Sequence, residues 1–251
     1  MHEWRARLPK LVVECAAQWQ LELGAPFASG AVSFAAPARR ADGDDVVLKI
    51  GFAHRESEQE ADALERWDGD GAVRLLARDD ARHALLLERC EPGTFLSGSA
   101  DDSLGVLIAL LPRLWVDPTG FHTLADEVAW WNLSGELGEL ARELAATQGE
   151  LVLVHQDLHG HNVLAAQREP WLVIDPKPLA AEREFAVAPI VRSGELGHSR
   201  PDALCRLDRL CAELGLDRER ARGWTIVQTV AWSEDAGYPE HGEVVEWLLQ
   251  A

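Results

Sequence analysis

Positive charge is scarce in this sequence. Its 251 residues include 24 Lys and Arg against 42 Asp and Glu, a formal net charge of −18. A chain this acidic repels nucleic acid and anionic membrane surfaces, so we exclude both as partners. A polyphosphate ligand would need local cations or Mg²⁺, whereas a polycationic ligand would be attracted. Taken alone, the high acidity favours the simpler explanation that it keeps the protein soluble.

Cysteine motifs, membrane spans and a secretory signal are also missing. Cys15, Cys90, Cys205 and Cys211 form neither a Cys-x-x-Cys motif nor a Cys/His cluster, which favours reduced, mostly buried thiols. No apolar run approaches the length of a membrane span. Residues 1–19 are typical of an amphipathic helix and lack the cleavage site of a signal peptide. We therefore expect a cytoplasmic monomer.

A regular glycine motif for phosphate binding is absent. Residues 23–32, LGAPFASGAV, match neither Gly-x-Gly-x-x-Gly nor a P-loop. Ser29 and Gly30 are the residues of this loop that we expect nearest a bound phosphate.

Three polar side chains stand out against the short apolar segments of residues 151–176: Asp157, Asn162 and Asp175. In metal-assisted phosphoryl transfer, one carboxylate accepts the proton of the attacking hydroxyl. An amide oxygen and a second carboxylate hold Mg²⁺ against the phosphates. The spacing fits the catalytic loop of kinases, with Asp157 as base and Asn162 and Asp175 as metal ligands.

The motifs HQDLHGHN (155–162) and WLVIDPK (171–177) resemble the aminoglycoside phosphotransferase family, in particular its streptomycin 6-kinases and hydroxyurea phosphotransferases. The resemblance extends over about residues 23–237 and is specific only in these two motifs. It implies an α+β, protein-kinase-like bilobal fold, with a nucleotide-binding lobe over residues 1–90 and a helical lobe over 91–251. ATP, or GTP as an alternative, would bind between them with Mg²⁺, and phosphorylation of a hydroxyl on the antibiotic would confer resistance.

In the first lobe, Lys49 ends a β-prone run in a context resembling the Val-Ala-Ile-Lys of kinases, where the lysine holds the α- and β-phosphates. A solvated edge lysine is the alternative. Glu60 is our choice to orient Lys49, because EADAL (60–64) resembles the Glu-Ala-x-Ala-Leu of the family. Glu56 and Glu58 remain alternatives.

Periodicity and turn residues predict the other elements. An apolar strand leads into Glu88 and Cys90, where the hinge of the family contacts adenine through backbone groups, so both are candidate nucleotide contacts. Strands are predicted at 31–35, 46–50, 73–77 and 84–87, and helices at 56–67, from the Asp101-Asp102 pair to 114, and at 124–146 with an interruption at 132–135.

One position departs from the family. A bracing Asp usually follows a Phe downstream of the metal Asp, and Ala186 occupies that position here. Either another acid, such as Glu184, replaces it or the catalytic loop is held less firmly, which would give a slower enzyme.

The resemblance implies a small hydroxylated and cationic acceptor, such as an aminocyclitol antibiotic. Carboxylates would recognise its guanidinium groups, although surface acids are expected anyway in so acidic a chain. Trp232, for which a core position is the alternative, begins a run that resembles a Trp followed by acids in the streptomycin kinases. The candidate acceptor or phosphate contacts are Lys177, Glu184, Glu195, Trp232, Glu234 and Asp235.

Two other functions remain open. Asp157, His159 and His161 resemble the opening of a two-metal phosphoesterase, which would also need ligands downstream, where only His198 and His241 occur. A nucleotide-binding pseudokinase is the second alternative.

Overall fold

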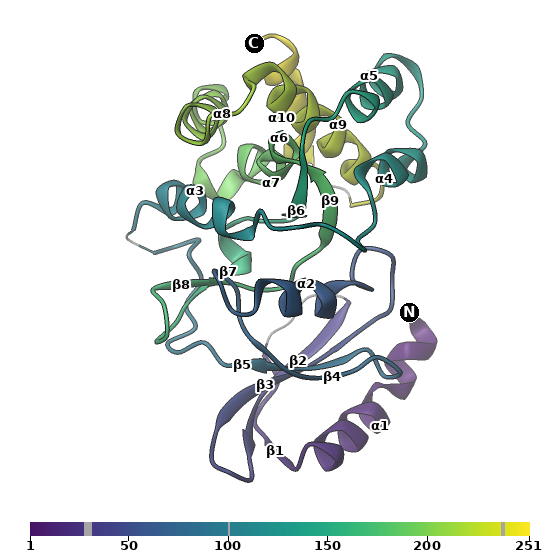
Figure 1. Ribbon diagram of the computed structural model, residues 1–251, viewed down its shortest axis with the longest axis vertical. Helices are drawn as coiled ribbons and strands as arrows, with labels where there is room; N and C mark the ends of the chain where they lie inside the picture. Colours follow the sequence, from purple (N-terminus) through teal and green to yellow (C-terminus); the bar gives the residue numbers. More distant parts are fainter. Residues whose placement is uncertain (28–31, 100, 237–238) are drawn as a thin grey trace. The chain divides into compact units, whose positions relative to one another are not determined.

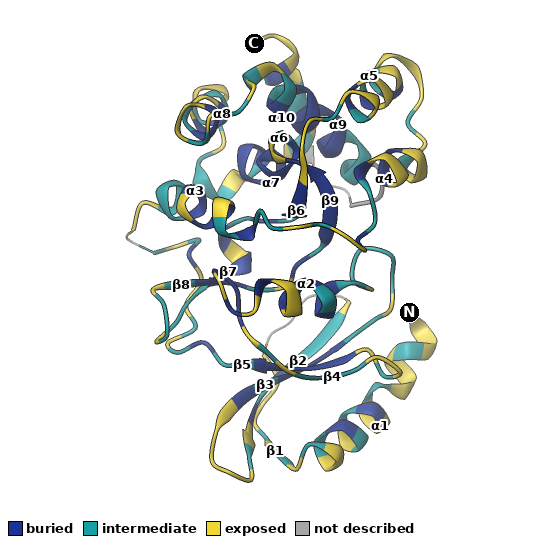
Figure 2. Ribbon diagram, in the orientation of Figure 1, coloured by how far each residue is buried: buried dark blue, intermediate teal, exposed yellow. Residues whose placement is uncertain are grey.

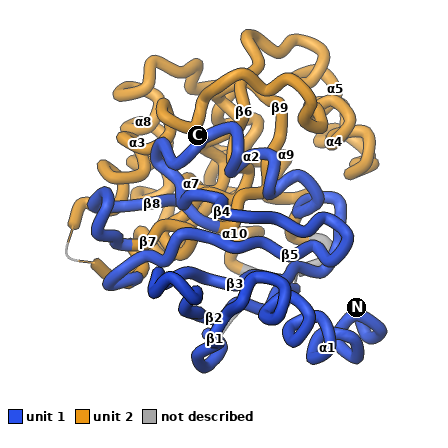
Figure 3. The backbone as a smooth tube through the Cα atoms, turned by 60° about the horizontal axis from the view of Figure 1, so that its bottom comes forward, with its two compact units in different colours: residues 1–93, 165–174 blue, residues 94–164, 175–251 orange. Residues whose placement is uncertain are grey.

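The computed structural model describes residues 1–27, 32–99, 101–236 and 239–251, and the side chains of 234–236 and 239 lie outside the description. The chain forms two compact units (Figure 3). Unit 1 comprises residues 1–93 and 165–174, and unit 2 comprises residues 94–164 and 175–251. Unit 1 thus takes in part of the hairpin that follows the predicted catalytic loop.

Unit 1 is built on a five-stranded antiparallel sheet (Figure 1). Short β-branched and leucine-rich runs form its centre, where side chains alternate between two covered faces. The strand order is β1-β2-β3-β5-β4, with β1 at Leu21–Leu23, β2 at Ser33–Arg40, β3 at Asp45–Gly51, β4 at Leu75–Asp79 and β5 at Ala84–Glu88.

The alternation in β3 decides which face Lys49 occupies. Leu48 and Ile50 are fully buried and pack with Leu11 and Cys15 of helix α1, His2–Gln18. Because neighbouring residues of a strand point to opposite faces, Lys49 lies on the face away from α1. Helix α2, Glu60–Trp67, follows β3 and supplies the partner of Lys49 on that face.

Helix α2 begins later than the sequence predicts. We expected a helix from residue 56, but residues 55–59 form turns and the helix starts at Glu60. The hydroxyl of Ser57 donates to the carbonyl oxygens of Phe52 and His54, both at 3.2 Å. Such side-chain bonds to local backbone compete with helix formation, which explains the difference.

Unit 2 is mainly helical around one strand pair, β6 (Leu151–His155) antiparallel to β9 (Pro178–Glu182). The short strands β7 (Val163–Ala165) and β8 (Trp171–Val173) form the hairpin in which the unit boundary falls. The helices are α3 (Ser103–Leu114), α4 (Leu124–Trp131), α5 (Gly135–Ala146), α6 (Arg183–Ala186), α7 (Ala188–Arg192), α8 (Arg200–Leu214), α9 (Arg218–Ala236) and α10 (Pro239–Leu249), with 3₁₀ turns η1 (Gly160–Asn162) and η2 (Gly194–Leu196).

Helix α9 is the central helix of unit 2. It packs against α5, α6, α7, α8 and α10, and its middle turns are buried throughout (Figure 2). Trp224 is fully buried and meets Phe185 edge to face, with ring centroids 5.4 Å apart. The indole N–H of Trp224 donates to the buried carboxylate of Glu182, which ties α9 to β9.

Local sequence signals for the helices of unit 2 are confirmed. The carboxylate of Asp102 accepts from the N–H of Gly105 at 3.0 Å and caps α3. The predicted interruption at 132–135 separates α4 from α5, with Asn132 in the left-handed region at φ 52°. None of the helices in the described ranges combines the length and apolarity needed to cross a bilayer. A β-sheet unit preceding a helical part confirms the α+β class.

Candidate active site

The loop after β6 is held by backbone and buried side chains. Nδ1 of His155 accepts from the N–H of Asp157 at 3.2 Å. The N–H of Gln156 donates to the carbonyl of Lys177 at 3.1 Å, and the side chain of Leu158 is fully buried. These contacts fix the backbone on both sides of Asp157, so its carboxylate is presented from a rigid segment.

Asn162 and Asp175 both present oxygen atoms that suit Mg²⁺. The amide nitrogen of Asn162 donates to the carbonyl of Asp157 at 2.8 Å. The amide oxygen is then the atom of this side chain that can bind a cation. Asp175 is exposed and has φ at 55°, a left-handed conformation that is uncommon outside glycine and concentrates at functional sites. Carboxylate and carbonyl oxygens are the ligands that Mg²⁺ prefers, so each of these two side chains is of a type that suits that cation.

Two cations flank the carboxylate of Asp157. Nζ of Lys177 lies 3.0 Å from one carboxylate oxygen, and the guanidinium of Arg192 lies 3.9 Å from the other. Burial would raise the pKa of Asp157, but the charges of Lys177 and His159 outweigh it and hold the pKa below its ordinary value. Asp157 is therefore ionised across the neutral range.

A glutamine, not an acid, braces the loop. Nε2 of Gln228 in α9 donates to the carbonyl of Gln156 at 3.0 Å, and its oxygen accepts from Arg192 at 2.5 Å. Burial lowers the pKa of Arg192 to about 10, partly offset by Asp157. Ala186, where the resemblance implies a bracing Asp, is buried in α6. The suggested substitute, Glu184, instead accepts from the N–H of Asp217.

Trp232 lies beside both of these cations. Its ring is 4.7 Å from Nζ of Lys177 and 4.8 Å from the guanidinium of Arg192. Such cation–π contacts restrain the two long side chains. The indole nitrogen is buried and has no hydrogen-bond partner within the described residues. From the sequence we expected Trp232 to contact the acceptor or to belong to the core. In the structure it packs against the two cations that flank Asp157.

In unit 1, the structure pairs Lys49 with Glu60. Nζ of Lys49 donates to the carboxylate of Glu60 at 2.6 Å, and both side chains are about one-tenth exposed. Of the two alternatives, Glu56 lies near His54 at 4.0 Å, and Glu58 precedes the helix. A buried lysine fixed by a carboxylate is a suitable group for polyphosphate.

Of the other residues expected to contact the nucleotide, Glu88 is held in an ion pair and Cys90 is buried. The carboxylate of Glu88 accepts from Arg168 at 2.9 Å and from the N–H of Arg74 at 3.0 Å. Cys90 is buried, and burial raises the pKa of its thiol to about 12, so it stays protonated. Ser29 and Gly30 lie outside the described residues.

The expected acceptor contacts are spread over unit 2. Glu195 in η2 accepts from the N–H of Gly160 and pairs with His159 and His161. Burial would raise the pKa of Glu195, but the hydrogen bond and charge of His159, the N–H of Gly160 and the charge of His161 together outweigh it, so the pKa lies below its ordinary value and the carboxylate is ionised. Glu234 and Asp235 belong to α9, but their side chains lie outside the described residues.

Arg192 and Gln228 were missed from the sequence. Arg192 closes a short helix, and Gln228 lies within a helix where a polar residue would ordinarily face solvent. Its position in the largely uncharged run TIVQTV (225–230) is the signal in the sequence that could have marked Gln228, which the structure shows to be buried.

Comparison with known proteins identifies the same family that the sequence motifs resemble. The family described as aminoglycoside/hydroxyurea antibiotic resistance kinase matches residues 18–237. The chain is 40% identical to hydroxyurea phosphotransferase of Kitasatospora aureofaciens, over 92% of this chain and 74% of that protein. It is 36% identical to streptomycin 6-kinase of Streptomyces griseus, over 93% of this chain and 85% of that protein.

Solved structures show the same fold. A choline kinase from Streptococcus pneumoniae gives a TM-score of 0.69 at 14% identity, covering 98% of this chain and 100% of that one. A thermostable mutant of an aminoglycoside phosphotransferase gives 0.62 at 14% identity, covering 96% and 97%. The kinase-like fold and the family predicted from the sequence are both confirmed. The chain is a phosphotransferase that belongs to the aminoglycoside/hydroxyurea antibiotic resistance kinase family.

Proposed function

We propose that this protein transfers the γ-phosphoryl group of ATP, with Mg²⁺, to a hydroxyl of a small cationic antibiotic of the streptomycin type. The observation that carries the proposal is the arrangement around Asp157, whose carboxylate and backbone are fixed by Lys177, Arg192 and Asn162. The relatives named above act on streptomycin and hydroxyurea, which supports a small antibiotic acceptor.

Each residue has a separate role in this proposal. When bound, ATP would supply the phosphoryl group, and Mg²⁺ would neutralise negative charge on the phosphate oxygens. Lys49, oriented by Glu60, holds phosphate oxygens, and the amide oxygen of Asn162 and the carboxylate of Asp175 hold Mg²⁺. Asp157 orients the acceptor hydroxyl and accepts its proton. Because its pKa is low, proton acceptance suits a transition state in which the proton leaves late.

Lys177 is expected to set the pH dependence of the reaction. Its charge is the largest influence that lowers the pKa of Asp157 against burial. Lys177→Met should therefore raise that pKa, so that Asp157 becomes protonated at a higher pH and activity is lost earlier on acidification. The measurement is kcat/KM between about pH 5 and pH 8 for both proteins. Lys10→Met, which changes an exposed lysine of α1, is the control; an acid limb at the same pH in both variants would contradict the prediction.

The acceptor is tested by an ADP-release screen with Mg·ATP. Streptomycin, other aminoglycosides, hydroxyurea, peptide and nucleoside antibiotics, choline and simple sugars are supplied one at a time, and products are identified by mass spectrometry. We expect streptomycin-type compounds to accelerate ADP release and to gain one phosphoryl group. Accelerated release with choline or a sugar alone would overturn the antibiotic assignment while leaving the kinase chemistry intact.

Hydroxyurea is the second candidate acceptor, favoured by the 40% identity to a hydroxyurea phosphotransferase. The dependence of KM on ionic strength separates the two classes. A cationic acceptor held by carboxylates should show a KM that rises with salt, because the charges at an open site are screened. Hydroxyurea is neutral, so its KM should be nearly independent of salt.

A further inference from the structure

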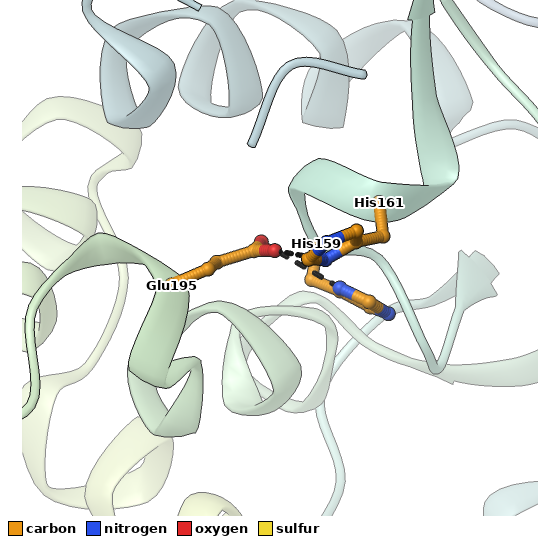
Figure 4. Close-up of side chains that lie close together, drawn as sticks. All are labelled: His159, His161 and Glu195. Atoms are coloured by element: carbon orange, nitrogen blue, oxygen red, sulfur yellow. Dashed lines mark ion pairs between the residues drawn. The ribbon is translucent and has the colours of Figure 1, made fainter. Parts of the chain in front are cut away.

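Three side chains of metal-ligand type gather beside the catalytic loop, apart from the proposed Mg²⁺ ligands. His159 and His161 flank Gly160, and Glu195 reaches them from η2 (Figure 4). Each offers one ligand atom, and these atoms all lie within 4.8 Å of one another. Both imidazoles present Nδ1 toward the same carboxylate.

The distances suit a single small cation. Nδ1 of His159 lies 3.5 Å from one oxygen of Glu195. Two ligands bonded to one zinc ion at about 2.0–2.1 Å in a tetrahedron lie roughly 3.4 Å apart. Nδ1 of His161 contacts the other oxygen directly, and a metal ion would replace that contact. Only small side-chain movements are therefore needed to close a three-ligand site.

The backbone around Gly160 is shaped for this approach. The N–H of Gly160 donates to Glu195, which orients the carboxylate toward the two rings. A Cβ at position 160 would come within 2.8 Å of Glu195 and 2.9 Å of the backbone nitrogen of Ser97. Only glycine lets η2 and residue 97 approach the loop so closely, and hydrogen bonds that orient ligands are typical of metal sites.

The segment that carries Glu195 is also anchored. The guanidinium of Arg206 in α8 donates to the carbonyls of Val191, Leu196 and Gly197 at 2.7–3.1 Å. Glu195 is therefore attached to a fixed turn, and its side chain is 11% exposed. His161 is 57% exposed, which leaves a path from solvent to the cluster.

The ligand types indicate the kind of metal. Two imidazoles and one carboxylate are the protein ligands of many zinc sites in which a fourth position stays open to water. Mg²⁺ prefers oxygen ligands in an octahedral arrangement and is a poor match for imidazole nitrogen. The cluster therefore differs in chemistry from the pair formed by Asn162 and Asp175.

We propose that His159, His161 and Glu195 form a binding site for a divalent transition metal of the Zn²⁺ type, separate from the Mg²⁺ ligands. Both histidines lie between Asp157 and Asn162, so an occupied site joins the catalytic loop to η2 and restrains the residues that carry the chemistry. The site does not depend on the identity of the acceptor or on phosphoryl transfer itself.

The test uses full-length protein without a histidine tag, freed of metal by a chelator and then titrated with CoCl₂. Co²⁺ substitutes for Zn²⁺ and reports its ligands through visible absorption. We expect one Co²⁺ per chain and a tetrahedral or five-coordinate spectrum. ZnCl₂ should bleach the signal by displacement, whereas a large excess of MgCl₂ should leave it unchanged.

Two variants and one control make the assignment specific. Glu195→Gln keeps an oxygen that accepts from Gly160 while removing the charged ligand, and His161→Ala removes an exposed ring. Each should weaken Co²⁺ binding by at least about tenfold. His198→Ala, which removes a histidine paired with Glu243 at 2.8 Å, should not change it. Circular dichroism confirms that each variant is folded.

Three results would overturn the proposal. They are the absence of stoichiometric Co²⁺ binding to wild type, equal affinity in wild type and both cluster variants, and displacement of Co²⁺ by MgCl₂ at millimolar concentration. Because these measurements use neither nucleotide nor acceptor, they are independent of the ADP-release screen. A failed screen with intact Co²⁺ binding would leave the metal site standing.

Discussion

Asp157→Asn is expected to lower kcat by roughly 10²–10⁴-fold, the usual contribution of a positioned general base. Asparagine keeps the size of the side chain but cannot take up the proton of the attacking hydroxyl. Mg·ADP affinity, measured by calorimetry, should change little, because Asp157 is assigned to the acceptor and not to the metal. Rates are measured on the acceptor that the screen identifies.

Two further variants frame this result. Asp175→Asn should reduce both turnover and Mg·ADP affinity, since its carboxylate is assigned to the cation. Asp208→Asn, at an exposed acid of α8 that pairs with Arg218 at 2.7 Å, should match wild type in both measurements. Turnover by Asp157→Asn at the wild-type rate would remove Asp157 from the mechanism.

Glu182→Ala is expected to cost roughly 3–5 kcal/mol in the free energy of unfolding, the range for breaking a buried ion pair. The carboxylate of Glu182 is 2% exposed. It accepts from Arg220 at 2.5 Å, from the N–H of Gly149 at 3.0 Å and from the indole N–H of Trp224. Alanine would leave the guanidinium of Arg220, the buried indole N–H of Trp224 and the backbone N–H of Gly149 without this acceptor.

The matched control is Glu150→Ala, close to the same strand pair. Glu150 is 77% exposed and pairs with Arg183 at 3.1 Å, so its loss should change stability by no more than about 0.5 kcal/mol. Urea unfolding followed by circular dichroism measures both variants. A loss below about 1 kcal/mol in Glu182→Ala would show that the surrounding donors find other partners or solvent.

The features that could be predicted from the sequence involve residues that lie close to one another along the chain. The cap at Asp102 acts on an N–H three residues away, and Lys49 and Glu60 are eleven residues apart, in a strand and the helix that follows it. The candidate catalytic loop could be proposed from the sequence because Asp157 and Asn162 belong to one short motif. In each case a few neighbouring residues determine the geometry.

The missed features depend on residues distant in the sequence. Gln228 braces Gln156 across 72 positions, and Arg220 reaches Glu182 across 38. Polar residues in a helix ordinarily face solvent, so the local sequence does not indicate which residues Gln228 and Arg220 contact. These contacts exist only once α9 is packed at the centre of unit 2, and helix packing of this kind is not encoded in any one segment.

The composition of unit 1 from two separated segments has a consequence for biosynthesis. Arg168 donates to the carbonyls of Gly69 and Ala72 and to Glu88, and Val173 exchanges backbone hydrogen bonds with Gly71 and Val73. The ribosome releases these partners long before residues 165–174 exist. At about 5–20 residues per second, residues 94–164 take roughly 4–14 s to synthesise. Throughout that interval the nascent unit 1 lacks its last segment, so we expect the backbone of residues 69–73, which precedes β4, to be accessible to chaperones and proteases until residues 165–174 emerge.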